Sequence, residues 1–426
     1  MKVSTCGTIV LSVFLAGSPL FAAGLWLYEG GTPDVGSANA GRAALAADAS
    51  TASANPAGLP QLERPQVLFA LQGLYLNSRF DTQVSGFGGG NGGNAGGWIP
   101  TGSLHYATPV NENTSVGVSL GSYFGLGVKY DSNWAGRYYI TEADLITFGV
   151  NPGIGYRVND TLSIGAGFTV MYAELSQRVA LNNAAALGVP GVPDGELRLE
   201  DDDIGYGYNL GVLFAPRPGT RLGLTYRSEI DLEFRDVASL RGLAPPLQGL
   251  LLQSGLAGSR LDLSMTVPQA LMFSAYQEIN DRWALVGNIG WQEWSRFGKQ
   301  ELSLRSAQSV SFTQDLDYDD TWHFALGARF RFAPEWLLSF GLAYDTSPVD
   351  SDSGRTPDLA LDRQVRFATG LQYDLSEDVT IGGAYEYIDL GSAGIDRNDG
   401  PLKGPLKGDY DTNAIHVLAF NVTWRF

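Results

Sequence analysis

Residues able to support catalysis are few in this sequence. Its three histidines, His105, His323 and His416, lie far apart along the chain. A hydrolytic triad needs a serine, a histidine and an orienting acid held together, and no nucleophile motif marks such a serine. The one cysteine, Cys6, lies close to the start of the chain, so a metal site of the His/Cys type is not expected. The sequence therefore predicts no enzyme activity, no metal site and no cofactor.

Arginine and acidic side chains indicate binding instead of catalysis. Arg329, Arg331 and Arg366 alternate with apolar residues, and a guanidinium is well suited to bind a carboxylate. The acidic runs 200–203 and 315–320 could bind divalent cations, although a solvated acidic rim is the simpler interpretation. With 45 acidic against 28 basic residues, the chain is a poor partner for nucleic acid, whose phosphates need Lys and Arg.

The segments that hold these side chains alternate with a period of two from Pro65 onward. In the last segment the apolar side chains occupy every second position: Leu418, Phe420, Val422, Trp424 and Phe426. The positions between them are small or polar: Ala419, Asn421, Thr423 and Arg425. Stretches 162–170, 322–332 and 336–343 repeat the pattern. Such strands are typical of transmembrane β-barrels, with one face toward lipid and the other toward a lumen.

The links between these segments alternate between short and long. Short links are expected at 110–113, 158–160, 215–220, 280–282, 333–335 and 376–378, and long ones at about 81–99, 131–142, 178–203, 235–259, 298–318, 346–362 and 389–411. Six short and seven long links join fourteen strands, with short periplasmic turns and long outer loops. A soluble sandwich with one wet face is the alternative fold, but it seldom lines that face with so many aromatic residues.

The first part of the chain differs from the barrel. Lys2, an apolar stretch at 8–15 and a small-residue exit predict a signal peptide over 1–22, too short to span a bilayer. Residues 23–63 are rich in Ala, Gly, Ser and Asn and show no strand periodicity, so they are expected to fill the lumen as a plug. The prediction is an all-β, 14-stranded antiparallel barrel over 64–426, with residues 23–63 as its N-terminal plug (hatch).

A set of short stretches is distinctive: 23–29, 40–43, 55–59, 123–127, 134–136, 320–322, 325–327 and 344–349, of which the plug motif Asn55, Pro56, Ala57 is the most specific. In these stretches the chain resembles the FadL-type outer-membrane transporters of long-chain fatty acids and aromatic hydrocarbons. The resemblance covers essentially the whole mature chain. Phe426, the terminal aromatic residue of an alternating strand, resembles the sorting signal that the outer-membrane assembly machinery recognises.

The resemblance implies a route for substrate. In the family, outer loops capture the substrate, a pocket beside the N-terminus of the plug binds it, and an inward kink in the third strand opens the barrel wall to the membrane. Gly121, Phe124, Gly125 and Gly127 are the expected kink residues. Glycine within a strand often marks a bulge or a bend, although these strands are glycine-rich in general.

Two long loops carry the residues expected to capture substrate. The first contains Leu187 and Val189, and the second contains Leu247 and Leu251. Because exposed apolar loops are costly in water, we expect them to fold as short helices against each other, either as a groove for hydrophobic solutes or as a simple cap. With Leu25 in the pocket beside the plug, and Arg329 and Arg366 facing the lumen, they complete the expected substrate-binding set.

The predicted function is passive uptake of hydrophobic compounds, chiefly long-chain fatty acids, by a monomer in the Gram-negative outer membrane, in contact with lipopolysaccharide. The stretch 171–174 lacks the basic residue that fatty-acid members tend to carry in the fifth strand, which leaves room for aromatic hydrocarbons as a neutral ligand. The competing functions are those of a diffusion porin, a surface adhesion barrel and an outer-membrane phospholipase.

Overall fold

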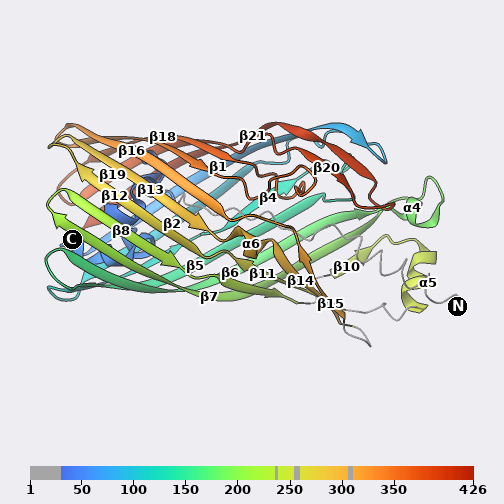
Figure 1. Ribbon diagram of the computed structural model, residues 1–426, viewed down its shortest axis with the longest axis horizontal. Helices are drawn as coiled ribbons and strands as arrows, with labels where there is room; N and C mark the ends of the chain where they lie inside the picture. Colours follow the sequence, from blue (N-terminus) through green and yellow to red (C-terminus); the bar gives the residue numbers. More distant parts are fainter. Residues whose placement is uncertain (1–29, 236–237, 254–259, 306–309) are drawn as a thin grey trace.

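The wall of the molecule is one antiparallel sheet closed on itself (Figure 1). The computed structural model describes residues 30–235, 238–253, 260–305 and 310–426. The main sheet has 17 strands, of which β4 (Gly125–Lys129) continues β3, and β10 (Ala238–Arg241) and β20 (Ile395–Asn398) only extend the rim. Fourteen strands therefore form the wall, as predicted. They are β1 (Gln66–Ser85), β2 (Trp98–Pro109), β3 (Thr114–Gly121), β5 (Glu142–Arg157), β6 (Leu162–Leu181), β7 (Gly195–Arg217), β8 (Thr220–Arg227), β12 (Ala270–Glu278), β13 (Trp283–Gln292), β16 (Thr321–Ala333), β17 (Trp336–Asp345), β18 (Gln364–Asp374), β19 (Val379–Asp389) and β21 (Pro405–Arg425).

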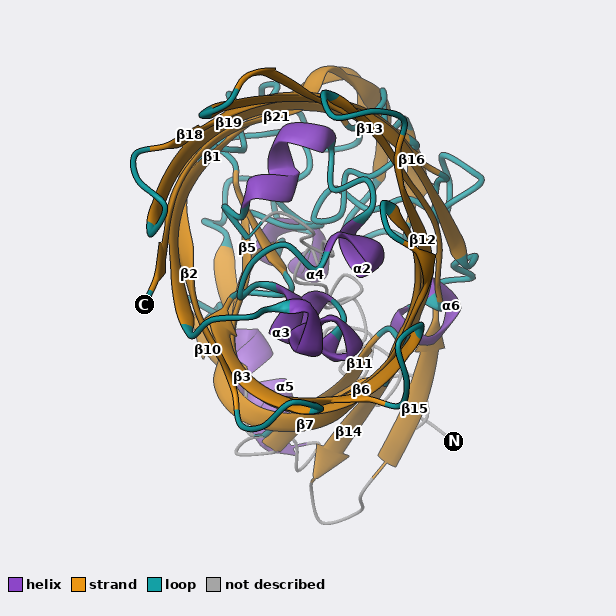
Figure 2. Cartoon of the chain, turned by 90° about the vertical axis from the view of Figure 1, so that its left-hand side faces the viewer, coloured by secondary structure: helices purple, strands orange, loops and turns teal. Residues whose placement is uncertain are grey.

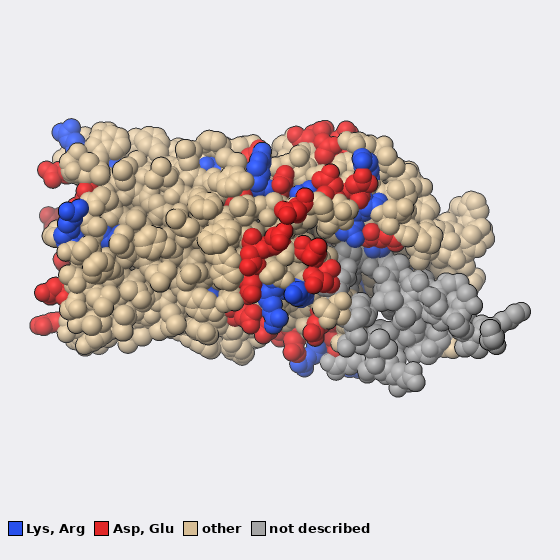
Figure 3. Space-filling view, viewed as in Figure 1, with Lys and Arg blue, Asp and Glu red and all other residues tan. Residues whose placement is uncertain are grey.

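The period-two pattern is an inside–outside pattern. Pairing of β1 with β2 on one side and with β21 on the other closes the barrel. Along β21, Phe420 is 65% exposed on the outer face whereas Ala419 is fully buried on the inner face. On the face seen in Figure 3, a broad band of the surface is almost free of Lys, Arg, Asp and Glu, and charged side chains gather on either side of it. This band has the composition of a wall that faces hydrocarbon.

The two ends of the barrel differ as the sequence predicts. Short turns join the strands at one end and long loops join them at the other (Figure 1), and in transmembrane barrels the short turns are typically periplasmic. No helix in the described parts of the chain is long and apolar enough to cross a membrane. The strands β6 and β7 continue to Leu181 and from Gly195, further than the predicted loop over 178–203 allows. They remain paired there, which satisfies their backbone groups beyond the apolar band.

The long loops contain structure of their own. A second antiparallel sheet is formed by β9 (Ile230–Phe234), β11 (Arg260–Val267), β14 (Lys299–Arg305) and β15 (Val310–Asp315). Among the described parts of these loops lie three helices: α4 (Asn183–Leu187), α5 (Pro245–Gln253) and α6 (Trp294–Phe297). The expected helices in the loops 178–203 and 235–259 are therefore present, and the sheet is an addition that the sequence did not indicate.

The described part of the N-terminal segment lies inside the barrel (Figure 2). It forms η1 (Pro33–Ser37), α2 (Arg42–Leu45), α3 (Thr51–Ala54) and η2 (Pro56–Gln61). Glycines of the wall make room for it: a Cβ at Gly341 would lie 2.0 Å from Ser37, and one at Gly223 would lie 2.0 Å from the Ala43 carbonyl. At these positions, small residues on both sides let the backbone of the plug contact the backbone of the wall directly. The predicted signal peptide lies outside the described residues.

Candidate functional site

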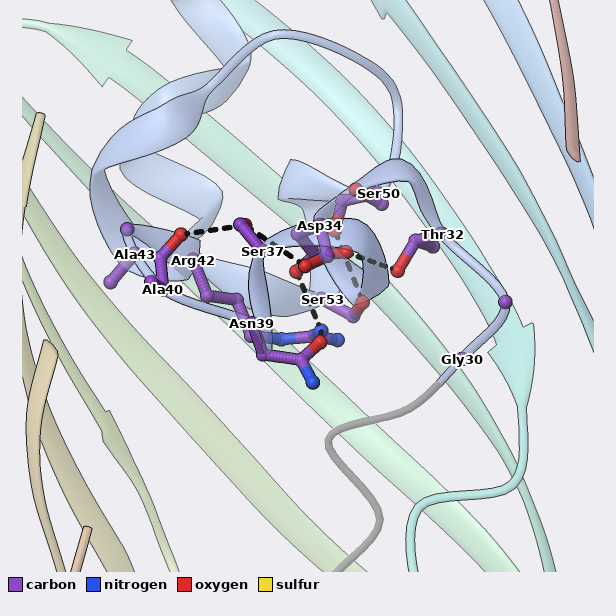
Figure 4. Close-up of polar contacts among 12 residues, drawn as sticks. Gly30, Thr32, Asp34, Ser37, Asn39, Ala40, Arg42, Ala43, Ser50 and Ser53 are labelled. Atoms are coloured by element: carbon purple, nitrogen blue, oxygen red, sulfur yellow. Dashed lines mark hydrogen bonds and ion pairs between the residues drawn. The ribbon is translucent and has the colours of Figure 1, made fainter. Parts of the chain in front are cut away.

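A buried polar cluster holds the first half of the plug in shape (Figure 4). The Arg42 Nη1 atom lies 2.8 Å from Asp34 Oδ2, and both side chains are buried. The Thr32 hydroxyl donates to the other oxygen of the same carboxylate. Arg42 also donates to Asn39 Oδ1 at 3.1 Å. A buried ion pair needs such additional hydrogen bonds to offset its desolvation, and here they make this half of the plug rigid.

Asn55 ties the second half of the plug to itself and to the wall. Its side-chain oxygen accepts the Ala57 amide at 3.1 Å, which caps η2. Its amide nitrogen donates to the Ala43 carbonyl at 2.7 Å and to the Val212 carbonyl of β7 at 3.0 Å. Gly211 provides the space, because a Cβ there would lie 1.9 Å from Asn55 Oδ1. Asn55 of the plug motif therefore connects two parts of the plug and attaches them to the wall strand β7.

Replacing this side chain should loosen the plug. With three hydrogen bonds at about 1 kcal/mol each, two within the plug and one to the wall, Asn55→Ala is expected to cost the plug roughly 3 kcal/mol, of which about 1 kcal/mol is docking to the wall. Brief ion-conducting openings should then appear in planar-bilayer recordings of the purified protein. Gln61→Ala, at the end of η2, is the matched control and should stay closed. Equal conductance of Asn55→Ala and the wild type would contradict this docking role.

The wall is interrupted beside β4. β3 pairs with β2 on one side and β5 on the other, but the ladder between β2 and β3 ends at Ser103 and Gly121. Within the described residues, β2 from Trp98 to Gly102 pairs only with β1, and β4 pairs only with β5. Backbone hydrogen bonding resumes at the end of β4, where the Lys129 amide donates to the Ala95 carbonyl at 2.7 Å. One edge of β2 is therefore left open within the barrel wall.

An extra residue causes the interruption. Gly121 faces Gly149 of β5 and Gly125 faces Ile146, so four residue steps on one strand oppose three on the other. This is a β-bulge, which bends a strand and ends its pairing on one side. Gly125 has φ +149°, and a Cβ there would lie 2.4 Å from the Leu145 carbonyl oxygen, so only glycine fits. Gly121, by contrast, pairs as an ordinary strand residue.

The bulge turns aromatic side chains toward the lumen. Phe124 is fully buried, with its ring centroid 5.5 Å from Phe297 and 6.2 Å from Trp294 of α6. Its backbone is fixed by the Thr147 hydroxyl, which accepts the Phe124 amide at 3.1 Å and donates to the Phe124 carbonyl. An aromatic cluster made from the bulge and from a loop helix therefore lies beside the open edge of β2.

The bulge is also connected to the plug. Arg227, the last residue of β8, donates to the Ser53 carbonyl of α3 at 2.5 Å. Its guanidinium carbon lies 5.4 Å from the centre of the Tyr123 ring, which belongs to the bulge. One side chain thus contacts plug and kink together.

The outer loops form an apolar cluster with a cavity beside it. Leu243, Ala244 and Leu247 are buried at its centre, and Leu187 packs against them from α4. The cavity is small, about 20 Å³, and is bounded by Leu181, Ala186, Leu247, Leu402 and Lys403, among others. Four segments that are far apart in the sequence, around Tyr138, Leu181, Leu247 and Leu402, therefore border one cavity at the outer end.

The comparisons with known proteins agree with this geometry. Residues 13–426 match the family described as "Outer membrane protein transport protein (OMPP1/FadL/TodX)". The chain belongs to this family. It is therefore an outer-membrane protein that transports hydrophobic compounds, and the predicted family and localisation are confirmed.

Its relatives include proteins of known name. It is 28% identical to the long-chain fatty acid transport protein of Escherichia coli O6:H1, covering 90% of this chain and 91% of that one. It is 27% identical to outer membrane protein P1 of Haemophilus influenzae, covering 91% and 90%. A solved FadL homologue of Pseudomonas aeruginosa shares the fold with a TM-score of 0.84 at 21% identity, covering 95% of this chain and all of that one. The Pseudomonas putida toluene transporter TodX gives a TM-score of 0.64 at 18% identity, covering 89% and 94%.

Within this family member, the expected arginines lie in two different places. Arg366 is almost fully buried, and its Nε and Nη2 atoms lie 2.9 Å from Asp345 Oδ2 and Gln364 Oε1. His323 Nδ1 lies 2.8 Å from Oδ1 of the same Asp345 carboxylate. Arg329 lies at the short-turn end instead, beside Asp48 of the plug in an open polar mouth. The two arginines do not converge on one headgroup site.

The structure brings some predicted residues together and separates others. Leu187 and Leu247 meet in the loop cluster, Leu251 lies in α5, and Val189 is exposed just after α4. Leu25 lies outside the described residues. Sequence reasoning missed Lys403, which borders the groove, and Trp294 and Phe297, which cover Phe124. The pair Leu402–Lys403 carried no distinguishing signal, because Leu406–Lys407 repeats it four residues later.

Proposed function

We propose that this protein takes up long-chain fatty acids passively, with the loop groove as the capture site and the bulge at 122–124 as a lateral exit. The observation that carries the proposal is the open edge of β2 beside a lumen that is closed by the plug. A solute that enters from the loops meets the plug inside the lumen. Beside it, the wall lacks the backbone hydrogen bonds between β2 and β4. The route therefore leads sideways, into the membrane.

The surroundings of this route are apolar. A continuous set of buried hydrophobic side chains runs from the loops to the bulge, and it includes Phe124, Met171, Leu199, Leu232, Leu263 and Trp294. Such a lining favours an acyl chain or a hydrocarbon and disfavours a sugar or an ion. It argues against a diffusion porin for polar solutes.

The fatty-acid assignment has two supports. Several relatives that are 26–28% identical over most of the chain are named long-chain fatty acid transport proteins. The chain also places a cation, Lys403, at the apolar groove, where an acid would meet it first. Aromatic hydrocarbons are the second candidate, because the same lining would pass a neutral ring.

Uptake of labelled oleate and labelled toluene by cells without their own transporter, with and without this protein, tests the proposal. Oleate uptake supports the fatty-acid assignment, and uptake of toluene alone would replace it with the second candidate. Uptake of neither, by protein shown to be folded in the outer membrane, would contradict the transport proposal. Swelling of proteoliposomes in sugars would instead indicate a porin, and surface binding that survives deletion of residues 23–63 would indicate an adhesion barrel.

A further inference from the structure

A polar mouth opens next to the plug, at the short-turn end of the lumen. Its volume is about 600 Å³, which lies within the range of small-ligand sites. Ala47 and Asp48 border it from the plug, and residues of several wall strands form its sides. Five arginines border this polar mouth, although the chain as a whole has a net charge of −17: Arg221, Arg282, Arg329, Arg331 and Arg425.

The strand register brings two of these arginines to one side of the polar mouth. Arg221 of β8 faces Tyr276 of β12, and Glu278 of β12 shares a row with Ala284 of β13 and Arg329 of β16. Because Tyr276 and Glu278 are two residues apart, the two rows are neighbours on the same face of the sheet. Arg221 and Arg329 therefore approach the cavity from strands on the same side of the barrel.

Arg221 has an incomplete set of partners. Its guanidinium carbon lies 4.1 Å from the centre of the Tyr276 ring, which is a cation–π contact. Its Nε atom is buried and has no hydrogen-bond partner. Within the described residues, Arg221 forms no ion pair. A buried guanidinium donor without an acceptor is costly, so an added acceptor at this position is favourable.

Arg329 is held by one long hydrogen bond. Its Nη2 atom lies 3.3 Å from Gln372 Oε1, beyond the usual N–H···O distances. No carboxylate in the described part of the chain forms an ion pair with it, although Asp48 of the plug is an electrostatic neighbour. Arg331, the next arginine on β16, is paired with Asp374 at 3.2 Å. Arg329 thus lacks the counterion that its neighbour has.

The acids that act on these two arginines bind other groups. Glu278 Oε1 accepts the Tyr276 hydroxyl at 2.8 Å. Asp48 Oδ1 accepts both the amide and the hydroxyl of Ser50. Each of these interactions lies within a short segment of the chain. The arginine side of the polar mouth therefore offers charged donors that form no ion pair with either acid.

We propose that the polar mouth binds a phosphate group, which Arg221 and Arg329 hold beside the plug. A tetrahedral phosphate presents several acceptor oxygens, and a guanidinium binds phosphate with two parallel hydrogen bonds. Two arginines that approach from different strands suit such a group better than they suit a planar carboxylate. The inference goes beyond uptake of hydrophobic compounds and does not depend on it, because the apolar lining lies between the outer loops and the bulge.

The test measures binding of inorganic phosphate, glycerol 3-phosphate and succinate to the full chain in a phosphate-free detergent, by isothermal titration calorimetry. Both phosphates should bind more tightly than succinate. Arg221→Gln and Arg329→Gln should each weaken phosphate binding about tenfold, as expected for a lost charged hydrogen bond. Arg217→Gln is the matched control, since Arg217 is exposed at the same end of the barrel and donates to the Thr220 hydroxyl at 3.0 Å.

Asp48→Asn gives a change that misfolding cannot imitate. The Asp48 carboxylate borders the same cavity, so removal of its charge should strengthen phosphate binding about threefold. Burial raises the pKa of Asp48, against the opposing effect of its hydrogen bonds to Ser50, and the measurement is made at pH 8 to favour the ionised carboxyl. Unchanged or weaker binding of phosphate to Asp48→Asn would overturn the position beside the plug.

The other outcomes also decide the question. If Arg217→Gln weakens binding as much as Arg329→Gln does, the attraction is that of general charge and the site is overturned. Lack of phosphate binding to the wild type, or equal binding of succinate, would overturn it as well. Binding of inorganic phosphate alone supports a site for the free ion, and binding of both phosphates supports a site for a phosphate ester. None of these results changes the expected uptake of oleate, so failure here leaves the proposed function standing.

Discussion

Deletion of Ser122 is expected to abolish uptake of hydrophobic substrate while leaving a folded barrel. The four steps from Gly121 to Gly125 oppose three steps of β5, so removal of one residue makes the two strands match. Without the bulge, β3 and β4 become one regular strand, which can pair with β2 from Trp98 to Gly102. The open edge then closes, and uptake should fall to the level of cells that lack the protein.

The inner face of the strand survives this deletion. Before the bulge the buried positions are odd-numbered, such as Ser115 and Ser119, and after it they are even-numbered, such as Phe124 and Val128. Deletion of Ser122 shortens the spacing by one residue, so the buried positions before and after the bulge then follow one continuous alternation. Phe124 and Val128 therefore stay on the inner face, and no apolar side chain has to move from one face of the wall to the other.

The control for this deletion is Ser122→Ala, which keeps the residue count and should transport normally. Heat-modifiable migration on gels and surface protease protection would verify that both variants are folded. A folded deletion variant that still takes up oleate at the wild-type rate would exclude the lateral route. Such a result would direct attention to the plug as the exit.

The same bulge shows how far the sequence could predict this structure. The wall strands were predictable because lipid demands apolar residues at every second outer position, as in 322–332. Around the bulge, however, apolar residues continue at even positions, with Val116 and Val118 followed by Phe124 and Val128. The pattern looks unbroken, yet the first pair faces outward and the second faces the lumen. Because the lumen above the plug is apolar too, alternation alone cannot reveal the change of face.

The candidate site was predictable to a similar degree. Leu187 and Leu247 could be paired because apolar loop residues must find cover from water, and these two loops are rich in them. Lys403 could not be placed beside them, since its position depends on how the loop 389–411 folds across the barrel mouth. Arg366 was expected to bind a headgroup, because its guanidinium faces the lumen. Its partner, Asp345, lies on the neighbouring strand, and only the register of β17 and β18 brings the two together.

Breaking the Arg366–Asp345 pair is expected to destabilise the barrel strongly. Both side chains are buried, at 1% and 10% exposure, with Nε and Oδ2 2.9 Å apart. Removal of one partner takes a close counterion away from the buried charge of the other, and breaking a buried pair in this way typically costs about 3–5 kcal/mol. We therefore expect Arg366→Met and Asp345→Asn each to lower the free energy of unfolding in urea by that amount. The double variant should lose less than the sum, because it leaves neither charge unpaired.

The double variant also decides what Arg366 does. If its guanidinium only balances Asp345, a folded Arg366→Met/Asp345→Asn barrel should take up oleate at nearly the wild-type rate. If it binds the substrate carboxylate in the lumen, as the sequence suggested, the double variant should regain stability and still fail to transport oleate. We expect the first outcome, because Asp345 and Gln364 already accept hydrogen bonds from this guanidinium.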